Sequence, residues 1–185
     1  MSRLIIPAIE QSPVASQPLL AGVNQQLGMV PNLMRVMSHS PAALEGYLSF
    51  NAALGKGALS NKLREQIALT VAEYNGCEYC LAAHTYLGKN LAKLSDAEIE
   101  AARALPSPYA AESKTNAALQ FAYEVADKHG HVSDATLSKV REAGFAETEI
   151  IEIVLNVAIN VLTNYVNNVT RTDVDFPKAN VRFVK

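Results

Sequence analysis

The chain has 185 residues, of which 49% are hydrophobic and 18% are charged, with 9 Gly and 8 Pro. This is the composition of an ordinary globular protein, long enough to bury a sizeable core, and we expect one domain over residues 1–185. The formal net charge is −2, from 16 Lys and Arg against 18 Asp and Glu. No dense basic run accompanies this balance, so neither nucleic acid nor an acidic membrane is an expected partner.

The N-terminal stretch lacks the pattern of a targeting segment. Its short apolar run is cut by Pro7 and Glu10, which makes it too brief and too polar for a signal peptide or a membrane anchor. We therefore expect a cytoplasmic protein. In a reducing compartment, two cysteines three residues apart are not expected to form a structural disulfide that stabilises the fold.

Helical patterns fill the first half of the chain. Ser40 is a predicted N-cap with Pro41 at the first helical position, and Ser60 opens a helix whose apolar residues share one face. Asn75 and Gly76 supply the residue types that close this helix in a left-handed turn. The predicted helices cover residues 17–27, a short segment ending at 37, 41–54, 60–74 and about 77–90.

The second half is also predicted to be helical. Ser95 and Glu98 form a capping box, which opens a helix that ends near Leu105. No segment alternates apolar and polar residues as a strand does, so we predict an all-α bundle of about eight helices. The remaining predicted elements are a loop over 105–110, helices over 112–129, 133–143 and 147–169, and an extended tail over 173–185.

The last predicted helix is apolar nearly all round, which is typical of a helix in the core or in an oligomer interface. One stripe of it is polar, because asparagine recurs at every fourth position from Asn156 to Asn168. Since buried amides need partners, this stripe is expected to meet another polar surface, either the helices around the cysteines or a neighbouring subunit. The stripe also leaves too short an apolar length for a membrane span.

Both cysteines and one of the four histidines lie in the segment "NGCEYCLAAHTYLG", residues 75–88. Each residue of an α-helix advances by about 100°, so Cys77, Cys80 and His84 share one face. Free amides and the helix dipole favour a thiolate at Cys77, and His84 can assist Cys80 in the same way. Either sulfur could attack a peroxide or a disulfide while the other resolves the product. The pattern predicts a two-thiol redox centre and leaves the order of the sulfurs open.

A proton relay needs a carboxylate near His84. If the helices before and after the Asn-Gly turn fold back on each other, Glu65 falls opposite residues 84–86, beside His84. Glu73 could instead lie near Cys77, and Glu78 is expected to point away from the thiol face. Glu65 is therefore the predicted partner of His84, and Glu73 is its rival.

Other interpretations of these residues are possible. Buried cysteines often serve only for packing, and two thiolates, an imidazole and a carboxylate can complete a tetrahedral zinc site. Three ligands within two helical turns are unlike a structural zinc finger, so we expect neither metal nor cofactor. The other histidines are expected at the surface, and an aromatic residue such as Tyr47 is expected in the core rather than in a pocket. The other histidines are His39, His129 and His131.

The spacing of Glu65, Cys77, Cys80 and His84 resembles the alkylhydroperoxidase D motif of the carboxymuconolactone decarboxylase-like superfamily. The segments "LGMVPNLMRVMSHSPAALEGYL" and "NVLTNYVNNVTRTDVDFP" resemble its peroxidase-related branch. The resemblance spans most of the chain, with the core motif over residues 60–90. Its most specific part is the spacing of the glutamate, the cysteines and the histidine.

The resemblance implies an all-helical fold, a trimer or hexamer, and thiol peroxidase activity without a cofactor. It implies that Cys80 is the peroxidatic nucleophile and Cys77 the resolving thiol. Glu65 and His84 would form a proton relay that activates Cys80, commonly through a water. The expected partners are a hydroperoxide and an external dithiol reductant. Alkylhydroperoxidase D itself has a second histidine just before its second cysteine, where this chain has Tyr79.

Two other functions remain as alternatives. One is lactone decarboxylation, the activity that gives the superfamily its name, although that chemistry needs a base and an electrophilic pocket and no thiol pair. The other is a zinc-binding or redox-sensing interaction protein.

Overall fold

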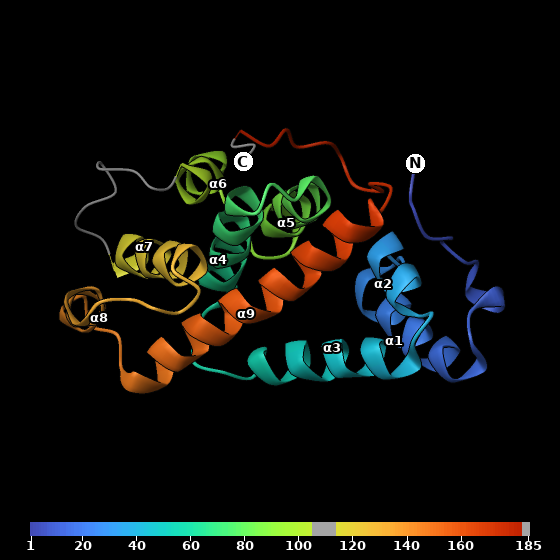
Figure 1. The fold of residues 1–185 in the computed structure, drawn as a ribbon, viewed down its shortest axis with the longest axis horizontal. Helices are drawn as coiled ribbons and strands as arrows, with labels where there is room; N and C mark the ends of the chain where they lie inside the picture. Colours follow the sequence, from blue (N-terminus) through green and yellow to red (C-terminus); the bar gives the residue numbers. More distant parts are fainter. Residues whose placement is uncertain (105–113, 183–185) are drawn as a thin grey trace.

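The computed structural model describes residues 1–104 and 114–182, and within them every regular element is a helix (Figure 1). The all-α fold is therefore confirmed, with nine α-helices in the described residues in place of the expected eight or so; α2 is only six residues long. The α-helices are α1 (Gln17–Leu27), α2 (Asn32–Met37), α3 (Pro41–Leu54), α4 (Asn61–Tyr74), α5 (Glu78–Asn90), α6 (Asp96–Arg103), α7 (Lys114–Asp127), α8 (Asp134–Glu142) and α9 (Glu147–Thr170).

Most predicted helix boundaries agree with the structure because the capping residues behave as expected. The Ser40 hydroxyl accepts a hydrogen bond from Ala43 N, and Ser95 and Glu98 make both bonds of the capping box. Two short 3₁₀ helices, Ile9–Gln11 and Val14–Ser16, were not predicted. The predicted loop over 105–110, the start of the predicted helix at 112 and the last three residues of the tail lie outside the described residues.

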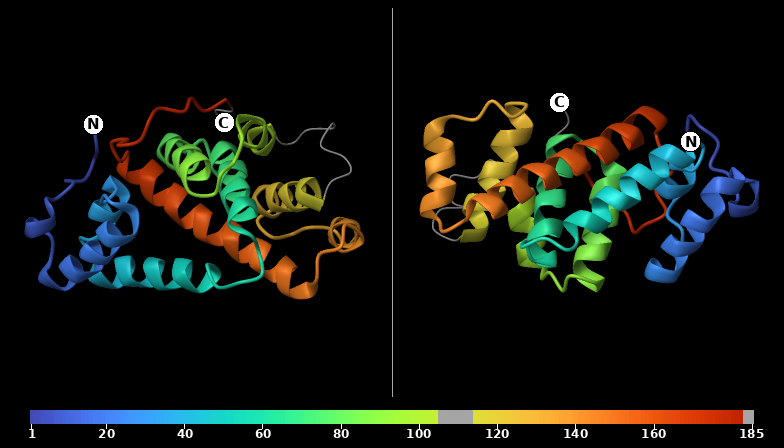
Figure 2. Two further views of the ribbon diagram at one scale, coloured as in Figure 1. Left: turned by 180° about the vertical axis from the view of Figure 1, so that it is seen from behind. Right: turned by 90° about the horizontal axis from the view of Figure 1, so that it is seen from below.

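Helix α4 lies at the centre of the fold. It packs against α5, α6, α7 and α9, and its side chains Ile67, Leu69 and Val71 are fully buried. Helix α9 crosses the molecule diagonally between α4 and α3, as the two further views show (Figure 2). The short turn after α4 folds α5 back beside it, so the cysteine-containing helix lies against the two most central helices.

The C-terminal segment after α9 runs back over α5 towards α6 (Figure 1). Its far end is held by a buried ion pair, in which Arg103 Nε donates to Glu73 Oε2 at 2.8 Å. Arg103 Nη2 also donates to the Asn180 carbonyl at 2.6 Å, and the Arg182 amide donates to the Glu73 carboxylate. Residues 173–182 of the predicted tail form no helix or strand.

Helix α9 has the length and hydropathy of a membrane span, so the expectation that its apolar length is too short is wrong. The helix also packs on α3, α4, α5 and α7, as a core helix does. Its buried face carries several asparagines, among them Asn156, Asn160 and Asn164. Its opposite face exposes large apolar side chains. These are Ile151, Leu155, Leu162, Tyr165 and Val169.

Candidate active site

The turn between α4 and α5 places the two cysteines. Gly76 adopts a left-handed conformation with φ of 60°, as its position in the turn requires. Cys77 is the N-cap of α5, and its Sγ accepts a hydrogen bond from the Cys80 amide at 3.4 Å. Both residues are buried and both are free thiols. The predicted start of the helix at or near Cys77 is confirmed.

The two sulfurs differ in acidity. Burial raises the pKa of Cys80, but a hydrogen bond from Cys77, the charge of His84 and the amides of Asn167 and Asn164 outweigh it and lower the pKa to about 7. The pKa of Cys77 is strongly raised, because its hydrogen bond to Cys80 and its burial outweigh the amides at the helix start. The sequence-based expectation that the helix start would favour a thiolate at Cys77 is therefore wrong. The more acidic sulfur is Cys80.

Asn167, on α9, is a site residue that the sequence analysis missed. Its Nδ2 lies 3.2 Å from Cys80 Sγ, and the side chain is buried. The neighbouring Asn164 is also buried, and its Oδ1 accepts a hydrogen bond from Asn75 Nδ2 at 2.9 Å. The asparagine stripe thus contacts the turn before the cysteines. This agrees with one of the two partners expected for the stripe, the polar surface around the cysteines. Asn167 lies three residues after Asn164 and is therefore not part of the four-residue repeat that revealed the stripe in the sequence.

The predicted contact between Glu65 and His84 is confirmed. His84 Nδ1 lies 2.9 Å from Glu65 Oε2, and both side chains are roughly three-quarters buried, with exposures of 22% and 24%. Burial lowers the pKa of His84, but the charge and hydrogen bond of Glu65 and the charge of Cys80 raise it overall. The rival Glu73 instead pairs with Arg103, and Glu78 is exposed. His84 Nε2 takes no part in this contact, and the charge of His84 acts on Cys80.

A cavity of about 290 Å³ opens beside Cys80. Cys80, His84 and Glu65 all line it, whereas Cys77 does not. Tyr47 also lines it, so the expectation that this residue serves only in the core is wrong. Most of the wall is apolar. It includes Val23, Leu27, Leu33, Met34, Leu48, Leu87 and Phe176.

Tyr79, which occupies the position of the second histidine in alkylhydroperoxidase D, forms part of this wall and anchors the C-terminal segment. Its hydroxyl donates to Asp175 Oδ1 at 2.8 Å and accepts from the Leu33 amide at 3.1 Å. Asp175 Oδ2 in turn accepts from the amide of Asn32, the first residue of α2. Burial raises the pKa of Tyr79, so the hydroxyl keeps its proton and the hydrogen bond to Asp175. Tyr79 therefore joins α5, α2 and the C-terminal segment at the edge of the cavity.

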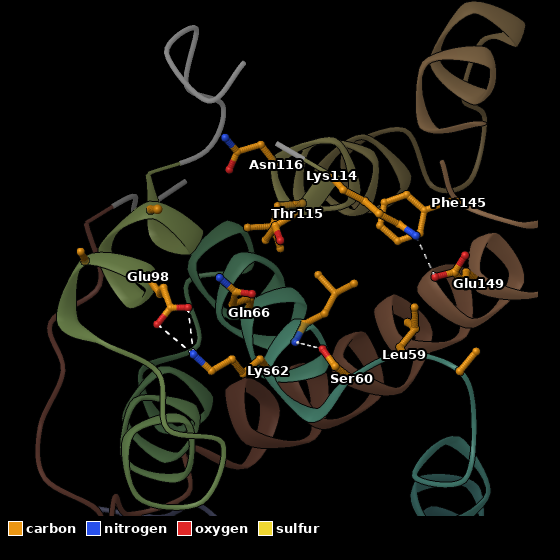
Figure 3. Close-up of a pocket in the computed structure, with 15 residues that line it drawn as sticks. Leu59, Ser60, Lys62, Gln66, Glu98, Lys114, Thr115, Asn116, Phe145 and Glu149 are labelled. Carbon is orange, nitrogen blue, oxygen red and sulfur yellow. Dashed lines mark hydrogen bonds and ion pairs between the residues drawn. The ribbon is translucent and has the colours of Figure 1, made fainter. Parts of the chain in front are cut away.

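A larger cavity, of about 640 Å³, lies on the other side of α4 (Figure 3). Lys62 pairs with Glu98 in it, and Lys114 pairs with Glu149 while lying over the Phe145 ring. None of its described lining residues is a cysteine or a histidine. Its described charges form ion pairs, whereas both Cys80 and His84 line the smaller cavity, so we take the smaller cavity as the candidate active site.

The zinc alternative requires at least three suitable ligands close together. Within residues 1–104 and 114–182, no three His, Cys, Asp or Glu side chains are grouped so that they could hold a metal ion. His39, His129 and His131 are exposed, as expected.

Comparison with solved structures identifies the fold. A peroxidase-related protein from Ralstonia eutropha JMP134, an alkylhydroperoxidase AhpD core, aligns with a TM-score of 0.83 at 23% identity and covers 94% of this chain and 92% of its own. A peroxidase-related protein from Silicibacter sp. TM1040 aligns with a TM-score of 0.79 at 24% identity, covering 96% and 92%. The debrominase Bmp8 aligns with a TM-score of 0.73 at 20% identity, covering 94% and 91%. The chain thus has the alkylhydroperoxidase D-like helical fold.

The sequence also matches a family model. Residues 41–124 match the carboxymuconolactone decarboxylase family, and this segment includes α3, α4, α5 and both cysteines. No curated protein gives a significant match. The family match over residues 41–124 and the shared fold support the resemblance to the carboxymuconolactone decarboxylase-like superfamily and its alkylhydroperoxidase D-like proteins. The family resemblance noted in the sequence is confirmed.

Proposed function

We propose that this protein is a thiol-dependent hydroperoxide reductase. The superfamily supports an enzymatic function, either peroxidase-related or decarboxylase-like. One observation favours a peroxidase over a decarboxylase. The more acidic sulfur, Cys80, lines the cavity beside His84 and Glu65, while the less acidic Cys77 is buried and does not line it. Such an arrangement suits an attacking thiolate with a reserve thiol next to it.

In the first step, the Cys80 thiolate attacks the terminal oxygen of the hydroperoxide. The O–O bond breaks, Cys80 becomes a sulfenic acid, and the leaving alkoxide takes a proton from His84 to form an alcohol. The charge of Glu65, 2.9 Å from His84 Nδ1, keeps that proton available by raising the pKa of His84. The sulfur is oxidised by two electrons and the peroxide is reduced by two.

In the second step, Cys77 condenses with the sulfenic acid. The Cys77 sulfur bonds to the Cys80 sulfur, and the hydroxyl leaves as water with the Cys77 proton. An external dithiol then reduces the disulfide by exchange and restores both thiols. We place this cycle in the cytoplasm, where dithiol reductants are available.

The test is consumption of cumene hydroperoxide with dithiothreitol as reductant. We expect Cys80→Ser to abolish turnover, and Cys77→Ser to consume one equivalent of peroxide when the dithiothreitol is left out. His84→Gln should lower the rate, while His129→Gln, a matched control at an exposed histidine, should leave it unchanged. Unchanged turnover in Cys80→Ser would rule out the mechanism.

Reductive debromination is a second candidate, favoured by one structural relative. A cysteine-to-alanine variant of the debrominase Bmp8 has been solved with 2,3,4-tribromopyrrole and shares this fold at a TM-score of 0.73. The same thiol pair could reduce an aryl bromide to the arene and bromide ion while forming the disulfide. Release of bromide from 2,3,4-tribromopyrrole, without consumption of cumene hydroperoxide, would favour this candidate.

Lactone decarboxylation would require activity that survives the loss of both cysteines.

We also propose that the protein forms a homo-oligomer, a trimer or hexamer, through the exposed face of α9. The apolar positions 151, 155, 158, 162, 165 and 169 are separated alternately by four and three residues. This is the spacing with which identical helices pack side by side, so a second copy of the chain is the natural occupant. We expect light scattering to show an oligomer that Leu162→Lys dissociates and that Lys139→Glu, at an exposed position on α8, does not. A monomeric wild-type protein would contradict the proposal.

A further inference from the structure

Arg64 is a cation in the wall of the cavity beside Cys80, and its charge has no acidic partner among the residues that the structure describes. It lies on α4, directly before Glu65, and also lines a polar cavity of about 40 Å³ next to the larger one. Arg64 Nε donates to Asn156 Oδ1 and Nη2 donates to Asn51 Oδ1, both at 3.3 Å. Within the described parts of the chain, no Asp or Glu forms an ion pair with Arg64, and Nη1 makes no hydrogen bond.

Nearby carboxylates are engaged elsewhere. Glu65 is turned towards His84, and Glu152 accepts hydrogen bonds from the amides of Ala58 and Leu59. Arg103, by contrast, is buried against the Glu73 carboxylate at 2.8 Å. A half-buried guanidinium held by two long bonds to neutral amides retains donors in the planar arrangement that matches a carboxylate. Arg64 is therefore oriented by Asn51 and Asn156 but not neutralised by them.

The rest of the cavity suits an apolar body. Its wall is formed largely by aliphatic and aromatic side chains from α1, α2, α3 and α5, together with Phe176 of the C-terminal segment. A volume of about 290 Å³ is at the lower end of the roughly 300–1,000 Å³ typical of ligand pockets, so a small ligand fits. Among the described lining residues, the cationic side chains are Arg64 and His84, and a single guanidinium favours a singly charged ligand group over a phosphate dianion.

We propose that Arg64 binds the carboxylate of a small amphipathic acid, whose apolar body fills the cavity and whose hydroperoxide group reaches Cys80. This inference deepens the proposed function and rests on it for the reacting group. Arg64 and Cys80 line the same cavity, so a ligand bound to Arg64 by its carboxylate extends its other end along the apolar wall. Binding of the carboxylate can in this way orient the hydroperoxide group for reaction. The substrate class is a carboxylic acid hydroperoxide, reduced to the corresponding hydroxy acid.

A binding experiment tests the carboxylate site without any turnover. Octanoate and octanamide have the same apolar chain and differ in charge, so calorimetric titration of each into the wild type isolates the contribution of the charge. We expect octanoate to bind at least 10-fold more tightly than octanamide. In Arg64→Gln, octanoate should lose roughly 10-fold or more in affinity, in line with the loss of a charge-assisted hydrogen bond, while octanamide should be unchanged.

Two further variants control for changes in folding and in overall charge. Arg64→Lys keeps the charge without the planar fork, so octanoate should bind it with intermediate affinity. Lys62→Gln removes a cation from the same helix that faces the other cavity, and it should bind octanoate as the wild type does. Equal binding of octanoate and octanamide to the wild type, or undiminished octanoate binding by folded Arg64→Gln, would overturn the inference.

Kinetics connect the binding site to the reaction. For a small carboxylic acid hydroperoxide, Arg64→Gln should raise KM with little change in kcat, whereas the KM for the methyl ester should not change. Equal changes for acid and ester would overturn the inference. If neither compound is reduced by the wild type, the proposed function fails, while selective octanoate binding still supports the carboxylate site.

Discussion

The amide of Asn167 is expected to keep Cys80 acidic, and Asn167→Ala tests this directly. Its Nδ2 lies 3.2 Å from Cys80 Sγ, both groups are buried, and the pKa of Cys80 is about 7. A hydrogen bond to a charged group contributes roughly 1.5–3 kcal/mol. At about 1.4 kcal/mol per pKa unit, its loss should raise the pKa by roughly 1–2 units.

The expected consequence is a slower reaction of Cys80 at neutral pH. With a pKa of about 7, half of the thiol is ionised at pH 7. A rise of about one unit reduces the ionised fraction to roughly a tenth, which predicts about 5-fold slower alkylation at that pH. The alkylation rate should converge with that of the wild type in alkaline solution, where Cys80 is fully ionised in both proteins.

The assay is alkylation by iodoacetamide over a range of pH, with the Cys80 peptide quantified by mass spectrometry. Asn160→Ala is the matched control, because Asn160 is a buried amide of the same helix that donates to the Asn156 carbonyl at 2.8 Å and not to the thiol. An unchanged midpoint in Asn167→Ala, or an equal shift in Asn160→Ala, would refute the reasoning.

Three other substitutions test the remaining parts of the site. Cys77→Ala should raise the pKa of Cys80 by removing a hydrogen-bond donor, measured by the same alkylation assay; a lowered midpoint would contradict this. Glu65→Gln should lower the pKa of His84, move the alkaline limb of the pH–rate profile to lower pH, and reduce turnover roughly 100-fold; an unmoved limb would count against the relay. Tyr79→Phe should reduce the free energy of unfolding in urea by about 1–3 kcal/mol, because its buried partners lose a hydrogen bond, and no loss would show that the anchor is unimportant.

Much of the fold could be predicted because its signals are local. Ser40 and Ser95 cap helices with their own side chains, and Gly76 adopts the left-handed turn that folds α5 back onto α4. Once that turn is known, the helical rise alone brings Glu65 opposite His84. The short 3₁₀ helices near the N-terminus were missed, because such brief elements have no periodic apolar pattern.

The parts of the site that were missed depend on contacts distant in sequence. Asn167 and Cys80 are 87 residues apart, and Tyr79 and Asp175 are 96 apart. No local pattern reveals which asparagine of α9 reaches the sulfur. The error over Cys77 has a different cause, because amides at a helix start favour a thiolate only when burial and a neighbouring sulfur do not outweigh them.

The central claim is that Cys80 is the group that peroxide oxidises. It is tested most directly in Cys77→Ser, where a sulfenic acid cannot be resolved within the chain. After one equivalent of cumene hydroperoxide, dimedone should label the peptide at Cys80, and Cys80→Ser should show no label at Cys77. Labelling at Cys77 in Cys80→Ser, or no dimedone adduct at Cys80 in Cys77→Ser, would contradict the account.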